Sequence, residues 1–357
     1  MSASERLPRL HALQQAAERI ADGATPLGKK ARELLRDSTG LSPQGVEYAL
    51  VHCLEHRGGR TQLSQLARRA PTAPRAHILL SANVFVAAFR AIALGLSQSP
   101  QCFVRASRRE PGMAELLHDG SGGAFELCDA LSPTAGDHFW AYGSDQTLVE
   151  LRRSLPGGVH LHAHGAGMGV AVIAERGLRS GVPLLDVARA LARDVLAFDQ
   201  KGCLSPRLAL LEGDAQFCSA FAESLALALD EAESTVPRGT LSADEQAEAT
   251  RYERTMTYVG GARRAGKGLV VLEHEPERLF VPPVGRYIGL IPTGALSSRL
   301  RELSSRITTV GVFGDESLPG RVQACLGERR VVDVGKMQTP LLDGPVDLRT
   351  GWSSELV

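Results

Sequence analysis

Short apolar runs alternate with amphipathic runs of helical length between residues 77 and 313, and this alternation limits the fold more than any other feature. Apolar runs of this kind predict buried strands, and amphipathic runs with helical spacing predict helices. The expected strands are residues 77–83, 101–105, 125–130, 138–142, 159–164, 170–174, 208–211, 269–273, 287–291 and 309–313. The expected helices are residues 84–96, 145–155, 184–198, 216–232, 243–258 and 296–304. Strands that alternate with helices in this way predict a layered α/β fold with mostly parallel strands.

A helical segment comes before this alternating region. Residues 4–56 are expected to form three helices, with Leu7, Leu10 and Leu13 at helical spacing and Ser42-Pro43 at one helix start. A chain of 357 residues is long for one hydrophobic core, so two domains are expected. The pattern divides into an N-terminal helical segment (residues 1–74), a first α/β domain (75–200), a second α/β domain (201–334) and an extended tail (335–357).

The composition is that of an ordinary soluble globular protein. Lys plus Arg and Asp plus Glu both total 40, so the charge balance gives no argument for a nucleic-acid or membrane partner. The six cysteines are scattered without a C-x-x-C pair, which suits a reducing compartment. The N-terminus lacks the apolar core of a signal peptide, and no apolar run reaches the roughly 20 residues that span a bilayer. We therefore expect a cytoplasmic protein without a membrane span.

Cys203 is the candidate nucleophile. It lies in Ala197-Phe-Asp-Gln-Lys-Gly-Cys203-Leu-Ser-Pro206, a short polar turn after a long apolar helix. Polar surroundings and helix ends favour the thiolate, which is the reactive form, so a thiol lifted out of a packed scaffold suits nucleophilic attack. The alternative is a small buried cysteine with a packing role only.

Two polar positions near strand ends are candidates to act with this thiol. Asn83 follows an apolar strand, where its amide could donate to a developing oxyanion together with the backbone N–H of Cys203, or could simply cap a helix. Gly143 and Ser144 lie between a strand and a helix. Free N–H groups at a helix N-terminus suit a pyrophosphate, although ordinary capping by Ser144 explains the pattern as well.

Arginines gather after the strand at 101–105. Arg105, Ser107, Arg108 and Arg109 could bind the ribose 2′-phosphate of NADP through charge-assisted hydrogen bonds. The alternative is a basic loop exposed to solvent.

Three histidines alternate in His160-Leu-His162-Ala-His164, so a strand would place their imidazoles on one face. They could hold zinc with Cys203 as a further ligand, or one of them could act as a general base. The glycine-rich run 165–169 is followed by a strand-like segment, whereas a dinucleotide fingerprint requires a helix there. We therefore do not assign the run to cofactor binding.

Taken together, these stretches resemble the acyl-CoA reductases of the aldehyde dehydrogenase superfamily, in particular the fatty acid reductase component of bacterial bioluminescence. The resemblance runs in family order over roughly residues 75–340, and its most specific part is the cysteine motif. The matching stretches are Ser81-Ala-Asn83-Val, Ala88-Phe-Arg90-Ala, Leu94-Gly-Leu96, Val104-Arg-Ala-Ser107, Ala141-Tyr-Gly-Ser-Asp145, His164-Gly-Ala-Gly-Met-Gly-Val-Ala171, Phe198-Asp-Gln-Lys-Gly-Cys-Leu-Ser-Pro206 and Gly335-Lys-Met-Gln338.

The resemblance implies an aldehyde dehydrogenase-like α/β fold, with a Rossmann-like NADP-binding domain over residues 75–200 and a catalytic domain over 201–334. It further implies that a cysteine forms a thioester with the acyl group and that NADPH, or alternatively NADH, delivers hydride to release an aldehyde. Cys203 would be the nucleophile, His164 the general base and Asn83 the oxyanion donor.

The resemblance also implies the cofactor contacts. Arg105 and Ser107 would meet the adenosine ribose, with Arg105 in place of the usual lysine, and Gly143 and Ser144 would face the pyrophosphate. An acyl-CoA or another acyl thioester is the expected substrate, no metal is expected, and a homo-oligomer or a complex with an acyl-activating enzyme is compatible with this family. The chain is shorter at its N-terminus than the typical fatty acid reductase.

Two other hypotheses remain from the sequence. One keeps the fold without the redox step, as an acyl-binding or acyl-transfer partner protein. The other is a zinc protein built on His160, His162 and His164.

Overall fold

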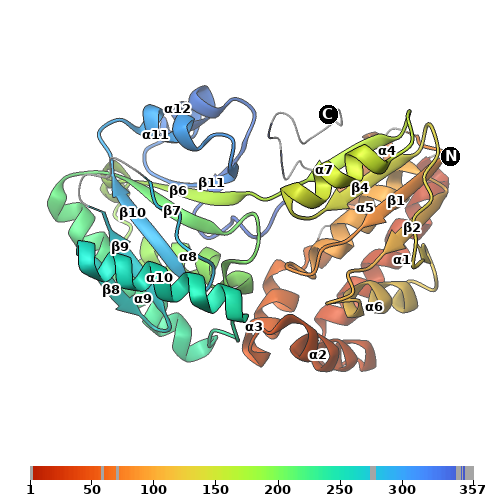
Figure 1. The fold of residues 1–357 in the computed structure, drawn as a ribbon, viewed down its shortest axis with the longest axis horizontal. Coiled ribbons are helices and arrows are strands. Elements are labelled where there is room, and N and C mark those ends of the chain that lie inside the picture. Colours follow the sequence, from red (N-terminus) through yellow and green to blue (C-terminus); the bar gives the residue numbers. More distant parts are fainter. Residues whose placement is uncertain are drawn as a thin grey trace.

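The computed structural model describes residues 3–57, 60–69, 72–273, 279–342, 347 and 349, and within them the chain forms two α/β halves side by side (Figure 1). Each half is built around one sheet. The first sheet has the strand order β3-β2-β1-β4-β5, and the second has the order β12-β11-β6-β7-β10-β9-β8. The predicted α/β architecture is confirmed.

The first sheet is parallel throughout, and helices cover both of its faces. Its strands are β1 (Arg75–Leu79), β2 (Gln101–Arg105), β3 (Glu126–Leu127), β4 (His138–Tyr142) and β5 (His160–His164). The helices of this half are α1 (Ala3–Ala21), α2 (Pro26–Thr39), α3 (Pro43–Tyr48), α4 (Arg60–Arg69), α5 (Ala87–Gln98), α6 (Gly112–Gly120) and α7 (Asp145–Ser154). Helix α3 runs on into a π-helical turn, η1 (Ala49–Cys53), and a 3-10 turn, η2 (Glu55–Arg57). One core joins α1 and α5 to one face of the sheet, and a smaller core packs α7 on the other.

The second sheet is parallel except for the antiparallel pairing of β8 with β9. Its strands are β6 (Met168–Ala174), β7 (Pro206–Glu212), β8 (Ala262–Ala265), β9 (Gly268–Leu272), β10 (Tyr287–Pro292), β11 (Ile307–Phe313) and β12 (Arg330–Asp333). Its helices are α8 (Leu184–Leu196), α9 (Ala215–Thr235), α10 (Ala243–Val259), α11 (Leu296–Leu303) and α12 (Leu318–Leu326), with 3-10 segments η3 (Glu175–Ser180) and η4 (Ala197–Gln200). Helices α8 and α9 pack on one face, and α10, α11 and α12 pack on the other.

Local sequence explains where several helices begin. Ser42 accepts a hydrogen bond from Gly45 N and Pro43 occupies the first helical turn of α3, as the sequence predicted. Ser242 and Glu245 form a reciprocal capping box at the start of α10. Asp214 caps α9 through Phe217 N.

The domain boundary expected near residue 200 is wrong with respect to the sheets. The chain leaves the first sheet after His164 and enters the second at Met168, so β6 and α8 belong to the second half. The reason is that only the short run Gly165-Ala-Gly167 connects the two sheets, and no polar linker marks the crossing. Strand β6 is buried along its whole length in the centre of the second sheet.

Some elements differ from the sequence expectation. The strand expected over 77–83 ends at Leu79 and α5 begins only at Ala87, so Asn83 lies in the connection between them. Elements α4, α6, α12, β8 and β12 were not predicted. The segment 335–342 packs back against the body of the protein, and most of the expected tail lies outside the described residues. None of the described helices is long and apolar enough to cross a membrane.

Candidate active site

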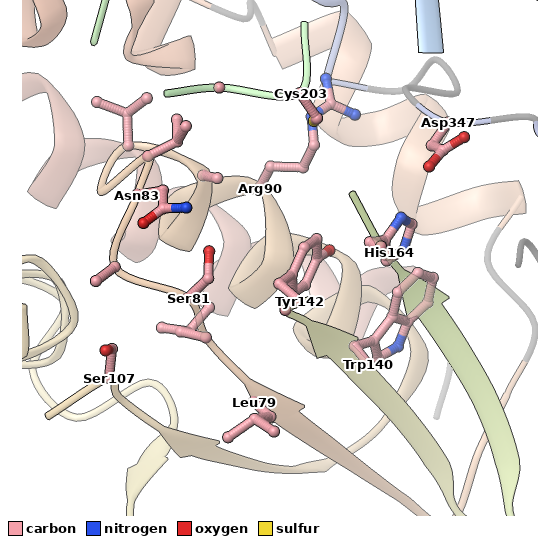
Figure 2. Close-up of a pocket in the computed structure, with 18 of the residues that line it drawn as sticks. Leu79, Ser81, Asn83, Arg90, Ser107, Trp140, Tyr142, His164, Cys203 and Asp347 are labelled. Atoms are coloured by element: carbon pink, nitrogen blue, oxygen red, sulfur yellow. The ribbon is translucent and has the colours of Figure 1, made fainter. Parts of the chain in front are cut away.

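A cavity of about 1760 Å³ lies between the two halves and gathers the predicted site residues. Its wall includes the ends of β1, β2, β4 and β5 from the first sheet and the turn before β7 from the second. Every residue predicted for catalysis or cofactor binding lines it: Asn83, Arg105, Ser107, Gly143, Ser144, His164 and Cys203. Figure 2 shows Asn83, His164 and Cys203 on different sides of this space.

The turn that carries Cys203 begins with an unusual backbone. Phe198, Asp199 and Gln200 all have left-handed conformations, with φ of 54°, 49° and 64°. Non-glycine residues in this region cost roughly 1 kcal/mol or more each and persist only where their surroundings hold them. The strain lies directly before the nucleophile, which indicates a conformation kept for the site.

Buried polar contacts hold this turn in place. Asp199 Oδ1 pairs with the buried Arg286 guanidinium at 2.9 Å, and Asp199 Oδ2 accepts from Gly239 N at 3.0 Å. The Gln200 side-chain amide donates to Pro206 O and Tyr287 O and accepts from Tyr287 N, at 2.7–2.9 Å. These contacts tie the turn to the first residues of β7 and β10.

The other side of the turn rests on the second sheet and on the 335–338 segment. Thr308 Oγ1 donates to Cys203 O, and Gln338 Nε2 donates to Ser205 Oγ at 3.3 Å. Gly169 is required on β6, because a Cβ there would collide with Leu204 O. The nucleophile therefore sits on a rigid support.

We expect Asp199→Ala to lower the free energy of unfolding by about 3 kcal/mol, because it removes one partner of a buried ion pair while the strained backbone remains. Urea unfolding measures this change. Asp186→Ala is the matched control, because Asp186 makes an exposed ion pair with Arg189 on α8 and its loss should leave the midpoint almost unchanged. Equal effects of the two substitutions would contradict the structural role of Asp199.

The thiol of Cys203 is more buried than the sequence suggested. Burial, with a smaller contribution from the nearby Asp347 carboxylate, raises the pKa of the thiol to about 11, and Arg349 partly opposes this. The expectation that the turn provides thiolate-favouring surroundings is therefore wrong for the free protein. The thiol is protonated at neutral pH and needs a base to attack.

His164 at the end of β5 has the properties of that base. Burial lowers its pKa to about 4, so the imidazole is neutral at physiological pH. Its Nε2 atom is buried and makes no hydrogen bond to the described residues. The ring stacks on Tyr142, with centroids 4.6 Å apart, and Figure 2 shows it near Asp347. A neutral imidazole with a free nitrogen can accept a proton.

The three histidines of β5 share one face, as predicted, and all three line the cavity. They stack with β4 side chains, and His162 lies 4.0 Å from Trp140 between ring centroids. Within the described part of the chain, no group of three or more His, Cys, Asp and Glu side chains is arranged to hold a metal ion. The zinc hypothesis is therefore not supported by this geometry.

Asn83 presents its amide nitrogen to the cavity. Arg109 Nη2 donates to Asn83 Oδ1 at 3.0 Å, which fixes the orientation of the amide. The amide nitrogen then points toward the middle of the cavity, where it can donate to an oxygen atom (Figure 2).

Gly143 and Ser144 lie at the N-terminus of α7, as predicted. Ser144 caps this helix by accepting from Thr147 N at 3.2 Å, so the capping interpretation of its hydroxyl holds. Both residues nevertheless line the cavity, and the N-terminal end of α7 points positive partial charge toward it. The neighbouring Asp145 is turned away, since its Oδ1 accepts from Ala166 N at 2.8 Å.

Arg105 and Arg108 line the cavity at the end of β2 and form no ion pair with any described carboxylate. Arg109 is engaged with Asn83 instead. Arg105 also lines a smaller cavity of about 310 Å³, whose other walls are largely apolar, with Leu131, Leu151 and Leu155 among them. Two arginines without ion-pair partners among the described carboxylates therefore lie together at this end of the main cavity, and one of them also lines the smaller cavity.

Four residues that line the cavity were not predicted from the sequence: Trp140, Tyr142, Arg90 and Asp347. Tyr142 and Trp140 line the cavity on β4, and their alternation with His138 was the signal that could have placed them there. The buried Arg90 pairs with Glu55 at 2.6 Å and donates to Leu341 O and Leu342 O, which fixes the segment after Gln338. Asp347 pairs with Arg349, which donates to Gly165 O at 3.2 Å. No local sequence pattern predicts this pair.

The glycine-rich run 165–169 is confirmed not to be a dinucleotide fingerprint, because the strand β6 follows it. Gly165 is needed for packing, since a Cβ there would collide with the Asp145 carboxylate.

Comparisons with known proteins identify the fold and the family. The chain is similar to an oxidoreductase from Marinobacter aquaeolei, with a TM-score of 0.71 and 12% identity over 97% of this chain and 81% of that one. It is similar to a Mycobacterium tuberculosis aldehyde dehydrogenase complexed with NAD⁺, with a TM-score of 0.66 and 14% identity over 92% of this chain and 77% of that one. It is also similar to an E. coli NADP-dependent enzyme, with a TM-score of 0.66 and 14% identity over 94% of this chain and 78% of that one. The fold is therefore aldehyde dehydrogenase-like, as the sequence resemblance implied.

No curated protein matches the sequence significantly. The profile of the acyl-CoA reductase (LuxC) family, in contrast, matches residues 123–347, which contain His164, Cys203 and the 335–338 segment. This match covers more than half of the chain. The chain belongs to the acyl-CoA reductase (LuxC) family.

Proposed function

We propose that the protein reduces an acyl thioester, such as an acyl-CoA, to the aldehyde through a covalent acyl-Cys203 intermediate, with NADPH as the reductant. The observation that carries this proposal is the meeting of three groups in one cavity: a rigidly held thiol, a neutral imidazole with a free nitrogen, and an oriented carboxamide. Membership of the acyl-CoA reductase family supports the substrate class.

In this mechanism His164 removes the thiol proton as Cys203 attacks the thioester carbonyl. The high pKa of the thiol makes this help necessary, and the low pKa of His164 keeps the base ready. The Asn83 amide and the backbone N–H of Cys203 stabilise the oxygen that gains negative charge. Collapse expels the thiol of the leaving group, which takes the proton from His164, and leaves the acyl group on Cys203.

The residues at the strand ends fit a dinucleotide. The positive end of α7 at Gly143 and Ser144 suits the pyrophosphate, and the small apolar cavity beside Arg105 suits an adenine ring. When bound, the reduced dinucleotide supplies the hydride that converts the acyl group to the aldehyde. Arg105, Ser107 and Arg108 would bind the ribose side of the cofactor, and their free positive charge favours the 2′-phosphate of NADPH.

Arg105→Gln tests the cofactor assignment. We expect KM for NADPH to rise about 10- to 100-fold, because one charge-assisted hydrogen bond to the phosphate is worth about 1.5–3 kcal/mol. KM for NADH should change little. Steady-state kinetics with both cofactors measures the two values, and an equal rise for NADH would place Arg105 away from the 2′-phosphate.

The covalent step is tested by intact-protein mass spectrometry after exposure to a panel of acyl-CoAs, with and without NADPH. An acyl adduct that forms on the wild type and disappears when NADPH is added would support the proposal. An adduct that persists in the presence of NADPH and NADH would favour the acyl-transfer alternative. The absence of any adduct with all acyl thioesters would contradict both.

A further inference from the structure

A ladder of rings connects the solvent to His164 along one face of the first sheet. The parallel strands β4 and β5 pair His138 with His160, Trp140 with His162 and Tyr142 with His164. All six side chains line the cavity, and we call them the ring ladder. His160 at its outer end is exposed, His138 is half-buried, and His162 is buried with 4% exposure.

The imidazoles of the ladder are in contact with one another. The ring centroid of His138 lies 4.9 Å from that of His160 and 5.0 Å from that of His162. His162 Nε2 and His138 Nδ1 are 3.1 Å apart, within hydrogen-bond distance. Trp140 stacks between His162 and His164 and is not itself a carrier, because its Nε1 donates to Gln98 Oε1 at 3.2 Å.

The ring ladder brings polar atoms into a cavity whose other walls include apolar side chains such as Leu66 and Leu94. Among these polar atoms is the buried Nε2 of His164, which makes no hydrogen bond to the described residues. Leaving such an atom unpaired costs roughly 1–3 kcal/mol. A water molecule beside this nitrogen would satisfy it and join His164 to His162, which is two residues away on the same face of β5.

The proposed reaction needs such a path. The balance is acyl thioester + NADPH + H⁺ → aldehyde + thiol + NADP⁺, so one proton enters the site in every turnover. When the carbon–sulfur bond of acyl-Cys203 breaks, the sulfur keeps the electron pair and must take a proton. His164 is neutral after acylation because its proton left with the departing thiol, so a proton from the solvent must reach His164 before it can be passed to the sulfur. During this step the strand-end part of the cavity is needed for the dinucleotide.

We propose that His160, His138 and His162 form a proton relay that supplies His164 from the solvent. This inference rests on the proposed function for its role in turnover, but the relay itself is a property of the free protein. Each imidazole can accept a proton on one nitrogen while it releases one from the other, which is the requirement for a carrier.

Two substitutions of His162 test the relay. His162→Phe keeps a flat ring against Trp140 but cannot carry a proton, and His162→Ala leaves room for free imidazole. His118→Ala on α6 is the control, since His118 does not line the cavity. With preformed acyl-enzyme we expect both His162 variants to reduce the single-turnover rate about tenfold or more. Added imidazole should restore His162→Ala saturably and leave His162→Phe slow, while acylation without NADPH should change less than about twofold.

A second readout does not depend on acyl chemistry. Exchange of the His164 ring N–H with solvent, followed by NMR, should slow in His162→Phe and recover with imidazole in His162→Ala. Slower exchange in His162→Phe than in the wild type, together with no acyl turnover by the wild type, would leave the relay standing and contradict the proposed function. Unchanged exchange and reduction rates in both variants, a loss that imidazole does not restore, or a change only in acyl-chain preference would overturn the relay.

Discussion

Cys203→Ala is expected to lower acyl-CoA reduction by at least about 10⁴-fold, because removal of the nucleophile eliminates the covalent route and leaves only binding and oxyanion stabilisation. The protein should remain folded. The turn is held by Asp199, Gln200 and the Cys203 carbonyl, and none of these contacts uses the sulfur atom. Steady-state kinetics with saturating NADPH measures the loss, and circular dichroism checks the fold.

A second cysteine substitution provides the matched control. Cys325 on α12 is partly accessible like Cys203, but it does not line the cavity. Cys325→Ala should keep both the acyl adduct and the turnover of the wild type. Substantial turnover by Cys203→Ala would show that the thioester intermediate is not on the reaction path.

His164→Ala is expected to reduce the rate of Cys203 acylation by about 10²–10⁴-fold at pH 7, the range for loss of a general base. The physical reason is the high pKa of the Cys203 thiol, which leaves little thiolate to react without a base. With a thiol pKa of about 11, the unassisted thiolate fraction at pH 7 is on the order of 10⁻⁴. Rapid-quench mass spectrometry of the acyl adduct measures the rate directly, independent of reduction.

The pH profile distinguishes a base from a structural histidine. In the wild type His164 loses its proton-accepting form only as the pH falls through about 4, so acylation should stay nearly level between about pH 5 and pH 9. In His164→Ala the rate should instead rise about tenfold per pH unit toward pH 11, as the thiol itself ionises. If His164→Ala instead lowered the acylation rate by the same factor at every pH, His164 would have only a structural role in the site. His118→Ala again serves as the control outside the cavity.

Sequence patterns located the site better than they described its electrostatics. The single cysteine after a long helix, the alternating histidines and the polar residues at strand ends each report a local periodicity or a motif, and all of them line one cavity. The thiol pKa depends first on burial in the folded protein and then on Asp347 and Arg349, which come from the far end of the chain. Such long-range neighbours leave no local pattern, so the expectation of a thiolate-favouring turn failed.

The fold shows the same difference between features with a local sequence pattern and features that depend on distant neighbours. Strands β2 and β4 begin and end where the sequence predicted, because each has a short apolar centre, at 102–104 in β2 and at 139–141 in β4, flanked by polar residues. The edge strands β8 and β12 were missed, since an edge is only partly covered and tolerates charged residues such as Arg263 and Arg330. The crossing at 165–167 was missed because close packing, and not a polar linker, requires its glycines.

The placement of His164 on one sheet and Cys203 on the other has a consequence for how activity can be tuned. In the proposed mechanism, the distance for proton transfer depends on how the two halves are held together. Arg90, which pairs with Glu55, donates to Leu341 O and Leu342 O, and Arg349, which pairs with Asp347, donates to Gly165 O, so both ion pairs lie at this junction. A substitution at that junction can therefore slow thioester formation although all the reacting side chains are still present. For the same reason, if the two bodies were produced as separate polypeptides, thioester formation would report their reassembly.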